Sequence, residues 1–378
     1  MKLGGIQKFR VVLFAAGLFY SGLAFFNVNA YASSGSEGAS FLDIPVGAGP
    51  AALGSAYTAL ANDAYAPIYN PAGLGFLSST QLTAQHLSFL QSMNYEFGSF
   101  VIPLGHSQDD DKPTKALGTS IQYLGSGDIA GTDPAGNPIG SFTTNYTAYS
   151  LAYGQKLTDK LSLGLTGKAI NAKIADVSAT AYAADLGSLY QVTDNLKLAA
   201  TYTNLGSKLT FSSQDDSLPE AFHLGAAYQI QNHLRTTLEG VYSKTGLVSG
   251  RFGAEWTPIE AISLRAGYRT DTTNQLSAMA GMTVGLGVHV FGQEFSYAWL
   301  PYGDLGDTQY FSLLLKFGDK EEEKRNLIQY QSIKTHRTAS GHGEDQPEDL
   351  KQNDPDYQQL MQLLSDESKE IATKSSER

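Results

Sequence analysis

The chain has no cysteine and little charge. None of its 378 residues is Cys, and only 17% are Asp, Glu, Lys or Arg. The lack of cysteine excludes disulfides, thiolate metal sites and thiol nucleophiles. By contrast, the sequence contains 39 Gly, 21 Tyr and 18 Phe, and this aromatic enrichment favours strands over helices. The length allows one large domain or two ordinary ones.

Catalytic and cofactor motifs are also missing. The sequence contains no G-x-S-x-G, Walker or H-E-x-x-H pattern, and its seven histidines show no ligand spacing. His86, His223 and His289 leave a catalytic role as a minor alternative, with ordinary lumen or rim positions favoured. The acidic runs 109–111 and 215–216 are read as solvated rather than cation-binding. We therefore predict no enzymatic activity, no cofactor and no metal site.

The N-terminus has the pattern of an export signal. Lys2, Lys8 and Arg10 precede the uncharged apolar stretch 11–26, and Ala-Tyr-Ala follows at 30–32. This predicts a signal peptide over residues 1–32, with a retained single-span anchor as the alternative. Its removal changes the net charge from −11 to −14, because three basic residues are lost. So acidic a chain is not expected to bind nucleic acid.

Long apolar runs are absent after residue 33, whereas two-residue alternation is frequent. No later run approaches the ~18 apolar residues that a membrane helix needs. In residues 161–169, leucines alternate with polar or small residues, and 221–230 and 261–269 alternate likewise. Such alternation indicates strands with one apolar and one polar face. An exported chain of this kind is either a soluble sheet or a closed membrane barrel.

Strand length and loop asymmetry favour the barrel. The strands are about 9 to 13 residues long, close to the ~9–11 that cross a membrane and longer than the usual soluble strand. Short connections alternate with longer polar ones, except at 106–115, as expected for periplasmic turns and external loops. Aromatic residues precede four short turns and suggest an interfacial girdle: Tyr153, Tyr190, Tyr228 and Trp256.

We therefore predict an all-β fold, a transmembrane antiparallel β-barrel of about 14 strands within residues 79–317. The expected strands are 80–90, 94–104, 115–125, 143–155, 160–171, 180–191, 195–205, 219–230, 233–243, 248–257, 261–270, 276–285, 288–299 and 308–317. A short Gly-rich turn is expected at 285–287. Charged residues of the strands are candidates for charge ladders in the lumen or for a permeation path: Lys168, Lys197, Arg235, Glu239, Arg265 and Arg269.

The segment before the first strand is rich in small residues. Residues 50–63 ("PAALGSAYTALAND") have helical spacing, and Pro50 suits a first helical turn. Asn70 precedes Pro71, which disfavours helix at Asn70, and the Asn side chain can cap nearby backbone donors. Gly73 and Gly75 permit a tight path into the wall. We expect residues 33–78 to form a thin helical plug in the lumen.

The end of the chain differs in composition from the barrel. Residues 318–378 contain 14 acidic and 9 basic residues and few strand formers. A short amphipathic helix is expected where Tyr357, Leu360, Met361 and Leu364 share one face. An even strand count places this tail in the periplasm, as a frayed solubilising end or as a docking helix.

Residues 38–77 ("GASFLDIPVGAGPAALGSAYTALANDAYAPIYNPAGLGFL") resemble the N-terminal segment of the PorV/PorQ family of outer-membrane proteins, which is similar to the FadL fatty-acid transporters. The matching features are the small-residue segment, Asp63, and the turn Asn70, Pro71, Ala72 and Gly73. The resemblance implies a fourteen-stranded barrel in a bacterial outer membrane with a plug, or hatch, in its lumen.

Two functions follow from the resemblance. The first is passage of small hydrophobic molecules, gated by movement of the plug about Asp63 and the 70–73 turn. The alternative is a PorV-like accessory or docking component of type IX secretion without transport activity. The implied partners are outer-membrane lipids, hydrophobic small molecules, and secretion-system or periplasmic proteins bound through the tail.

Overall fold

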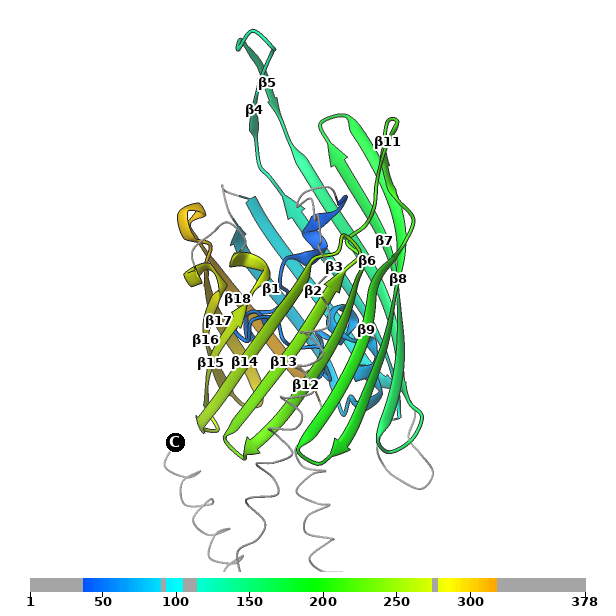
Figure 1. Ribbon diagram of the computed structural model, residues 1–378, viewed down its shortest axis with the longest axis vertical. Helices are drawn as coiled ribbons and strands as arrows, with labels where there is room; N and C mark the ends of the chain where they lie inside the picture. Colours follow the sequence, from blue (N-terminus) through cyan, green and yellow to red (C-terminus); the bar gives the residue numbers. More distant parts are fainter. Residues whose placement is uncertain (1–36, 90–92, 105–113, 274–277, 318–378) are drawn as a thin grey trace, which may run out of the picture. The chain divides into compact units, whose positions relative to one another are not determined.

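The computed structural model describes residues 37–89, 93–104, 114–273 and 278–317, and they form a closed antiparallel barrel of 14 strands (Figure 1). The signal peptide predicted at 1–32 and the tail predicted at 318–378 lie outside the described residues. None of the described helices is long and apolar enough to cross a membrane.

The barrel strands pair mostly with their neighbours in the chain, and β1 closes the barrel against β18, with Thr80 opposite Phe317. This confirms the predicted fold. The strands are β1 (Thr80–Phe89), β2 (Met93–Leu104), β3 (Lys115–Gly125), β6 (Thr144–Lys156), β7 (Leu161–Ile174), β8 (Val177–Thr193), β9 (Leu196–Gly206), β12 (Ala221–Gln231), β13 (Leu234–Ser243), β14 (Val248–Ile259), β15 (Ile262–Arg269), β16 (Met282–Val290), β17 (Gln293–Pro301) and β18 (Asp307–Phe317).

The wall has the polarity of a membrane barrel. On β7, Leu163 and Leu165 are 44% and 50% exposed, whereas Ser162 and Thr166 are fully buried. A soluble barrel would bury the leucines and expose the polar residues, so the inverted pattern fits lipid outside and a polar interior. Leu224, Trp256 and other large apolar residues of the remaining strands are exposed in the same way.

The predicted boundaries are wrong near the end of the barrel. The strands expected at 276–285 and 288–299 are β16 and β17, which begin later, and the Gly-rich stretch 285–287 lies inside β16. The turn is at Phe291 and Gly292, both with positive φ. The glycine at position 285 is explained by packing rather than by a turn, because a Cβ there would lie 2.4 Å from the Cβ of Ala52 in the plug.

Short turns and longer connections emerge at opposite ends of the barrel (Figure 1). The hairpin of β4 (Ile129–Thr132) and β5 (Pro138–Phe142) projects from the end of the barrel that has the longer connections. The same end carries the hairpin of β10 (Leu209–Phe211) and β11 (Gln214–Asp216). We call this the upper end. The connection at 106–115 lies mostly outside the described residues. Single-turn helices in the remaining connections are η4 (Asp271–Thr273), η5 (Ala278–Gly281) and η6 (Gly303–Leu305).

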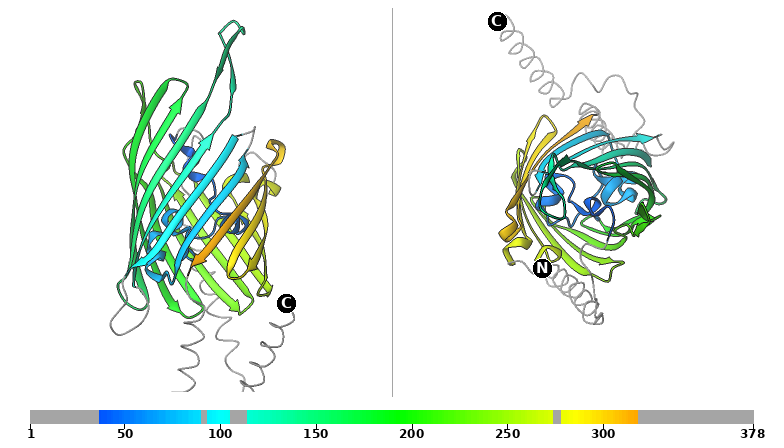
Figure 2. Two further views of the ribbon diagram at one scale, coloured as in Figure 1. Left: turned by 180° about the vertical axis from the view of Figure 1, so that it is seen from behind. Right: turned by 90° about the horizontal axis from the view of Figure 1, so that it is seen from above.

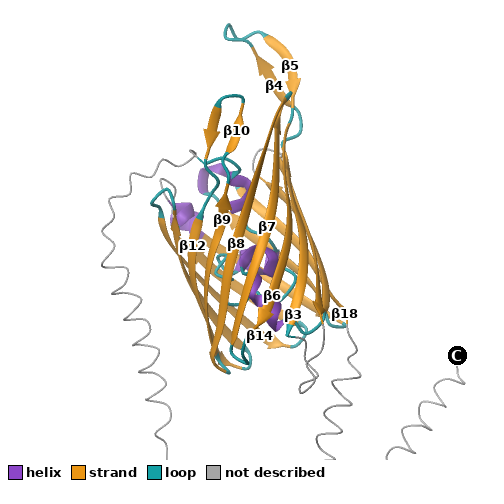
Figure 3. Ribbon diagram, turned by 90° about the vertical axis from the view of Figure 1, so that its right-hand side faces the viewer, coloured by secondary structure: helices purple, strands orange, loops and turns teal. Residues whose placement is uncertain are grey.

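Residues 37–78 lie inside the ring of strands, and we call them the plug (Figures 2 and 3). Its helices are η1 (Ser40–Asp43), α2 (Ala48–Ala52), α3 (Ala66–Tyr69) and η2 (Pro71–Phe76). The helix predicted over 50–63 is therefore wrong in length. It stops because Gly54 and Ser55 have positive φ, and the Gly54 amide nitrogen donates to the carbonyl oxygen of Ala51 and to Thr283 Oγ1 of β16.

Candidate functional site: the plugged lumen

Asn70 joins two parts of the plug to the wall. It is fully buried and ends α3 with an extended backbone. Its side-chain Nδ2 donates to the carbonyl oxygens of Thr58, at 3.0 Å, and of Ser188 on β8, at 3.1 Å. Its Oδ1 accepts from the backbone nitrogen of Ala72 at 3.1 Å. The capping expected from sequence is thus present, and the amide also holds plug and wall together.

The turn after Asn70 touches the wall where the wall has glycine. A Cβ on Gly164 of β7 would lie 2.2 Å from the carbonyl carbon of Pro71, and one on Gly187 of β8 would lie 2.2 Å from Oδ1 of Asn70. The carbonyl oxygen of Ala72 accepts from Ser162 Oγ at 2.6 Å. Gly73 meets the plug itself, because its Cβ would overlap the carbonyl oxygen of Ala61 at 1.4 Å. Backbone packing thus explains these small residues.

Asp63 organises the lower side of the plug. Its carboxylate accepts from the Tyr57 hydroxyl and, at 3.0 Å, from the backbone nitrogen of Tyr65. Burial raises the pKa of the Asp63 carboxyl, although both hydrogen bonds favour the ionised form. Asp63 therefore holds the 57–65 loop in shape, and its hydrogen-bond partners among the described residues belong to the plug rather than to the wall.

Two of the predicted lumen charges lie in the upper half. Lys168 (β7) pairs with Asp185 of β8 at 2.7 Å and donates to Asn204 Oδ1 at 2.7 Å. Asn204 has φ 59° at a register shift between β8 and β9, and this bulge lets it face the lumen beside Thr203.

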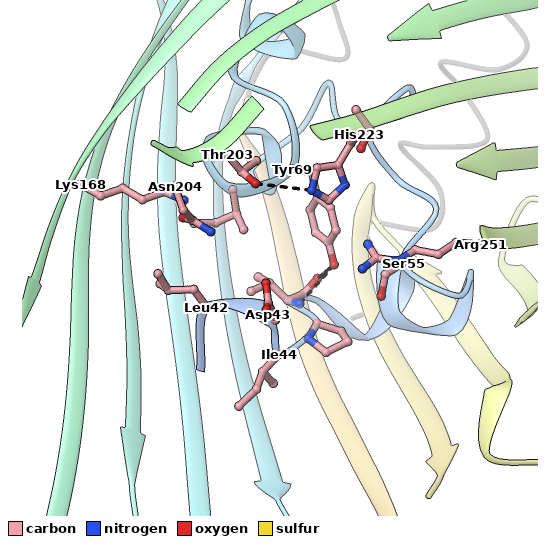
Figure 4. Close-up of a pocket in the computed structure, with 14 residues that line it drawn as sticks. Leu42, Asp43, Ile44, Ser55, Tyr69, Lys168, Thr203, Asn204, His223 and Arg251 are labelled. Atoms are coloured by element: carbon pink, nitrogen blue, oxygen red, sulfur yellow. Dashed lines mark hydrogen bonds between the residues drawn. The ribbon is translucent and has the colours of Figure 1, made fainter. Parts of the chain in front are cut away.

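Glu239 (β13) is the second predicted lumen charge in the upper half, and it binds both the plug and the wall. It accepts from the Thr58 backbone nitrogen at 3.0 Å and contacts His223 at 2.9 Å and Arg251 at 3.4 Å. Arg251 also reaches Asp271 at 3.2 Å. His223 is therefore part of an ion-pair network and bonds Thr203, as Figure 4 shows.

Most of the remaining predicted charges form ion pairs: a series between strands β13 and β17, which we call the ladder, and one pair near the rim of the barrel. Arg235 and Arg265 both bind Glu255, at 2.5 and 2.7 Å, and Arg265 also binds Glu294 at 2.7 Å. Arg269 binds Asp271 of η4 at 2.7 Å. Lys197 faces the lumen and lies close enough to Arg235 and Asp63 to interact with both electrostatically. The sequence prediction missed the carboxylate partners, although Asp185, Glu255 and Glu294 stand on the polar face of their strands.

The plug leaves a cavity on each side. The upper cavity, about 60 Å³, is lined by Leu42, Asp43, Ile44, Tyr69 and the Lys168, His223 and Arg251 side chains (Figure 4). The lower cavity, about 350 Å³, is lined by Asp63, the Arg235–Glu255–Arg265–Glu294 ladder and His289. A cavity of ~150 Å³ can hold benzene when it is apolar. The upper cavity is thus too small for such a ligand as it stands, and the lower one is large enough but polar.

An apolar lining covers the upper inner wall, against the general polarity of the lumen. Inward-facing residues there are buried: Leu87, Tyr95, Phe97, Ile170, Leu300 and Tyr310. Phe41 and Leu42 of η1 and Val46 pack in the same cluster, and the Phe41 ring lies 5.5 Å from that of Tyr146. We call this the apolar chamber; the plug's own side chains fill it.

Solved structures share this fold. The toluene transporter TbuX of Ralstonia pickettii matches with a TM-score of 0.50 at 14% identity, over 72% of this chain and 98% of its own. The monoaromatic hydrocarbon channel CymD matches with a TM-score of 0.54 at 13% identity, over 73% and 98%. At such identity the likeness concerns the fold alone. No family model and no curated protein sequence matches the chain. The PorV/PorQ resemblance thus stays an interpretation of residues 38–77.

Proposed function

We propose that this chain is an outer-membrane channel for small hydrophobic molecules and that movement of the plug gates it. The observation that carries the proposal is the apolar chamber, which is an unusual lining for a polar lumen and is filled by Phe41 and Leu42. A wall that binds apolar plug side chains can bind an apolar ligand of similar size once they withdraw. The shared fold of a toluene transporter and a hydrocarbon channel supports the same substrate class.

Passage through the lumen requires the plug to move. The plug separates a small upper cavity from the larger lower one, and Asn70 and Glu239 fasten its middle to the wall. The hydrogen bonds at Thr58 and Ser188 are individually modest, so they can break and re-form during transport. In this mechanism η1 leaves the apolar chamber, a ligand takes its place, and rearrangement of the 57–76 segment opens the way to the lower cavity.

A reversible lock tests the gate. A Cβ built on Gly225 of β12 lies 3.6 Å from the Cβ of Ala59, within the usual range for a disulfide. Because the chain has no native cysteine, the Ala59→Cys/Gly225→Cys pair would be its only disulfide. We expect oxidation to abolish uptake of a radiolabelled monoaromatic hydrocarbon into proteoliposomes and reduction to restore it. The single variant Ala59→Cys, treated identically, controls for the oxidant.

The outcomes separate the two functions implied by sequence. Uptake that continues when the disulfide has formed would refute plug gating. Absence of uptake in the reduced and wild-type proteins, together with recovery of secretion components on a pull-down, would support the accessory alternative instead. Heat-modified mobility on a gel shows in each case that the barrel is folded.

A further inference from the structure

The outer wall carries a hydrogen-bonded His–Glu pair on β1 and β2. His86 Nδ1 lies 2.6 Å from Glu96 Oε1, and their side chains are 53% and 47% exposed. Both residues point away from the lumen, because their chain neighbours Gln85, Leu87 and Tyr95 are buried inside. Neither residue takes part in the lumen networks, so the proposed channel function leaves the pair unexplained.

The pair lies at a depth where lipid tails are expected. His86 is six residues above Thr80, where β1 begins at the lower end, so it lies about 15 Å up at ~3.3 Å per residue and a tilt of ~40°. The lipid-facing apolar band of such barrels is ~25 Å tall. Ionisable residues in contact with lipid are unfavourable at this depth, whereas contact with protein can satisfy them.

The pair belongs to a narrow strip with apolar borders. Below it, Ala84 pairs with Gly98, and above it Ser88 pairs with Asn94. The bordering strands place bulky apolar residues at the same positions: Phe311 and Leu313 of β18, and Ile121 and Tyr123 of β3. We call Ala84, His86, Ser88, Asn94, Glu96 and Gly98 the polar strip.

We propose that the polar strip is the contact surface for a second copy of this chain, related by a two-fold axis normal to the membrane. Such an axis brings β1 of one copy opposite β2 of the other, so His86 faces Glu96 of the partner subunit, and the reverse contact follows by symmetry. Each imidazole thus faces a carboxylate of the other copy as a hydrogen-bond partner, and the strip is complementary to itself. Ala84 and Gly98 add room for close approach: a Cβ on Gly98 would meet only Ile121 and Thr83 atoms, at 3.6 Å or more.

Cysteine cross-linking in the native outer membrane tests the dimer. We expect Ala84→Cys, close to the proposed axis, to yield a disulfide-linked species of twice the monomer mass. Ala226→Cys is the matched control, because it replaces an alanine on β12, seven strands away in a ring of fourteen, and Ala226 shares the outward face of exposed Leu224. We expect no dimer from that variant.

Two further variants connect the dimer to the His86–Glu96 pair. His86→Leu/Glu96→Leu in the Ala84→Cys chain should lose the cross-link while the barrel stays folded, because leucine suits a lipid-facing wall. The charge swap His86→Glu/Glu96→His keeps the complementarity and should retain the cross-link. A folded Ala84→Cys protein without dimers, a cross-link to a different protein, or dimers that persist in the double-leucine variant would each overturn the proposal.

Discussion

The side-chain amide of Asn70 donates to the carbonyl oxygen of Ser188, 3.1 Å away, and ties the plug to strand β8. We expect Asn70→Ala to loosen the plug, since it also removes the bonds to Thr58 and Ala72 and leaves buried groups unsatisfied. Each such group costs about 1–3 kcal/mol. Amide hydrogen exchange should rise over residues 58–76 and stay unchanged in the strands.

Asn62→Ala is the control for that experiment. Asn62 also belongs to the plug but is exposed at the lower cavity, so its replacement should leave exchange in the plug unchanged. Equal protection of the plug in wild type and Asn70→Ala would show that the amide does not hold it.

A methyl group at Gly73 should displace the turn. The Cβ would lie 1.4 Å from the carbonyl oxygen of Ala61, and backbone on both sides cannot yield without moving the plug. We expect Gly73→Ala to increase proteolysis of the plug. Gly167→Ala on β7, whose Cβ would meet nothing within 4 Å, should behave as wild type. Limited proteolysis of both variants measures the difference, and resistance of Gly73→Ala equal to that of Gly167→Ala would contradict the expectation.

The apolar chamber gives a prediction about ligands. Phe41 is 2% exposed and contacts Tyr146, so Phe41→Ala should destabilise the chain by about 3–5 kcal/mol. A small aromatic ligand that fills the vacated space should recover part of this loss, because binding to the folded state stabilises it. The measurement is the unfolding midpoint with and without toluene. Ile129→Ala, in the projecting β4–β5 hairpin, is a control for which toluene should give no extra stabilisation, and an equal toluene response in both variants would argue against the chamber.

The strands could be predicted from sequence because a membrane wall imposes strict alternation on each of them. Where one face of a strand meets lipid, leucine and aromatic residues at every second position indicate which face that is. The exceptions are informative. Gly285 and Gly287 look like a turn in the sequence, but they lie within β16, where the plug and Arg265 approach the inner wall. A contact between distant segments leaves no local signal.

The plug was harder to predict for the same reason. The 50–63 segment has helical spacing, yet its backbone turns at Gly54 to bond Thr283, a residue over 200 positions later. The Asn-Pro turn could be predicted because its cap is local. Predicting the bond from Asn70 to Ser188 required knowledge of which wall residue lies opposite.

The upper cavity should respond to pH through Asp43. Although the Asp43 side chain is exposed at the upper cavity, the surrounding lumen partly desolvates its carboxyl; this desolvation, with the nearby Glu37 charge, raises its pKa to about 6 from an ordinary 3.8. The folded plug therefore holds a proton that the unfolded chain loses, so its stability falls as pH rises from about 4 through 6. Exchange of η1 amides, corrected for intrinsic rates, should increase over that interval. Asp43→Asn should remove the dependence; a variant that retains it would assign the titration elsewhere.

Glu239 and Arg251 should contribute unequally to stability. Replacing Glu239 by alanine leaves Arg251 and His223 without their shared carboxylate, in a site where Glu239 is 1% exposed. Breaking a buried pair in this way costs about 3–5 kcal/mol. Arg251→Ala should cost less stability, because each carboxylate that loses Arg251 retains another partner. His223 still binds Glu239, and Arg269 still binds Asp271. The double variant should be less destabilised than the sum, by a coupling of about 0.5–3 kcal/mol. Urea unfolding of all four proteins in detergent gives this value, and strictly additive losses would mean that the two side chains act independently.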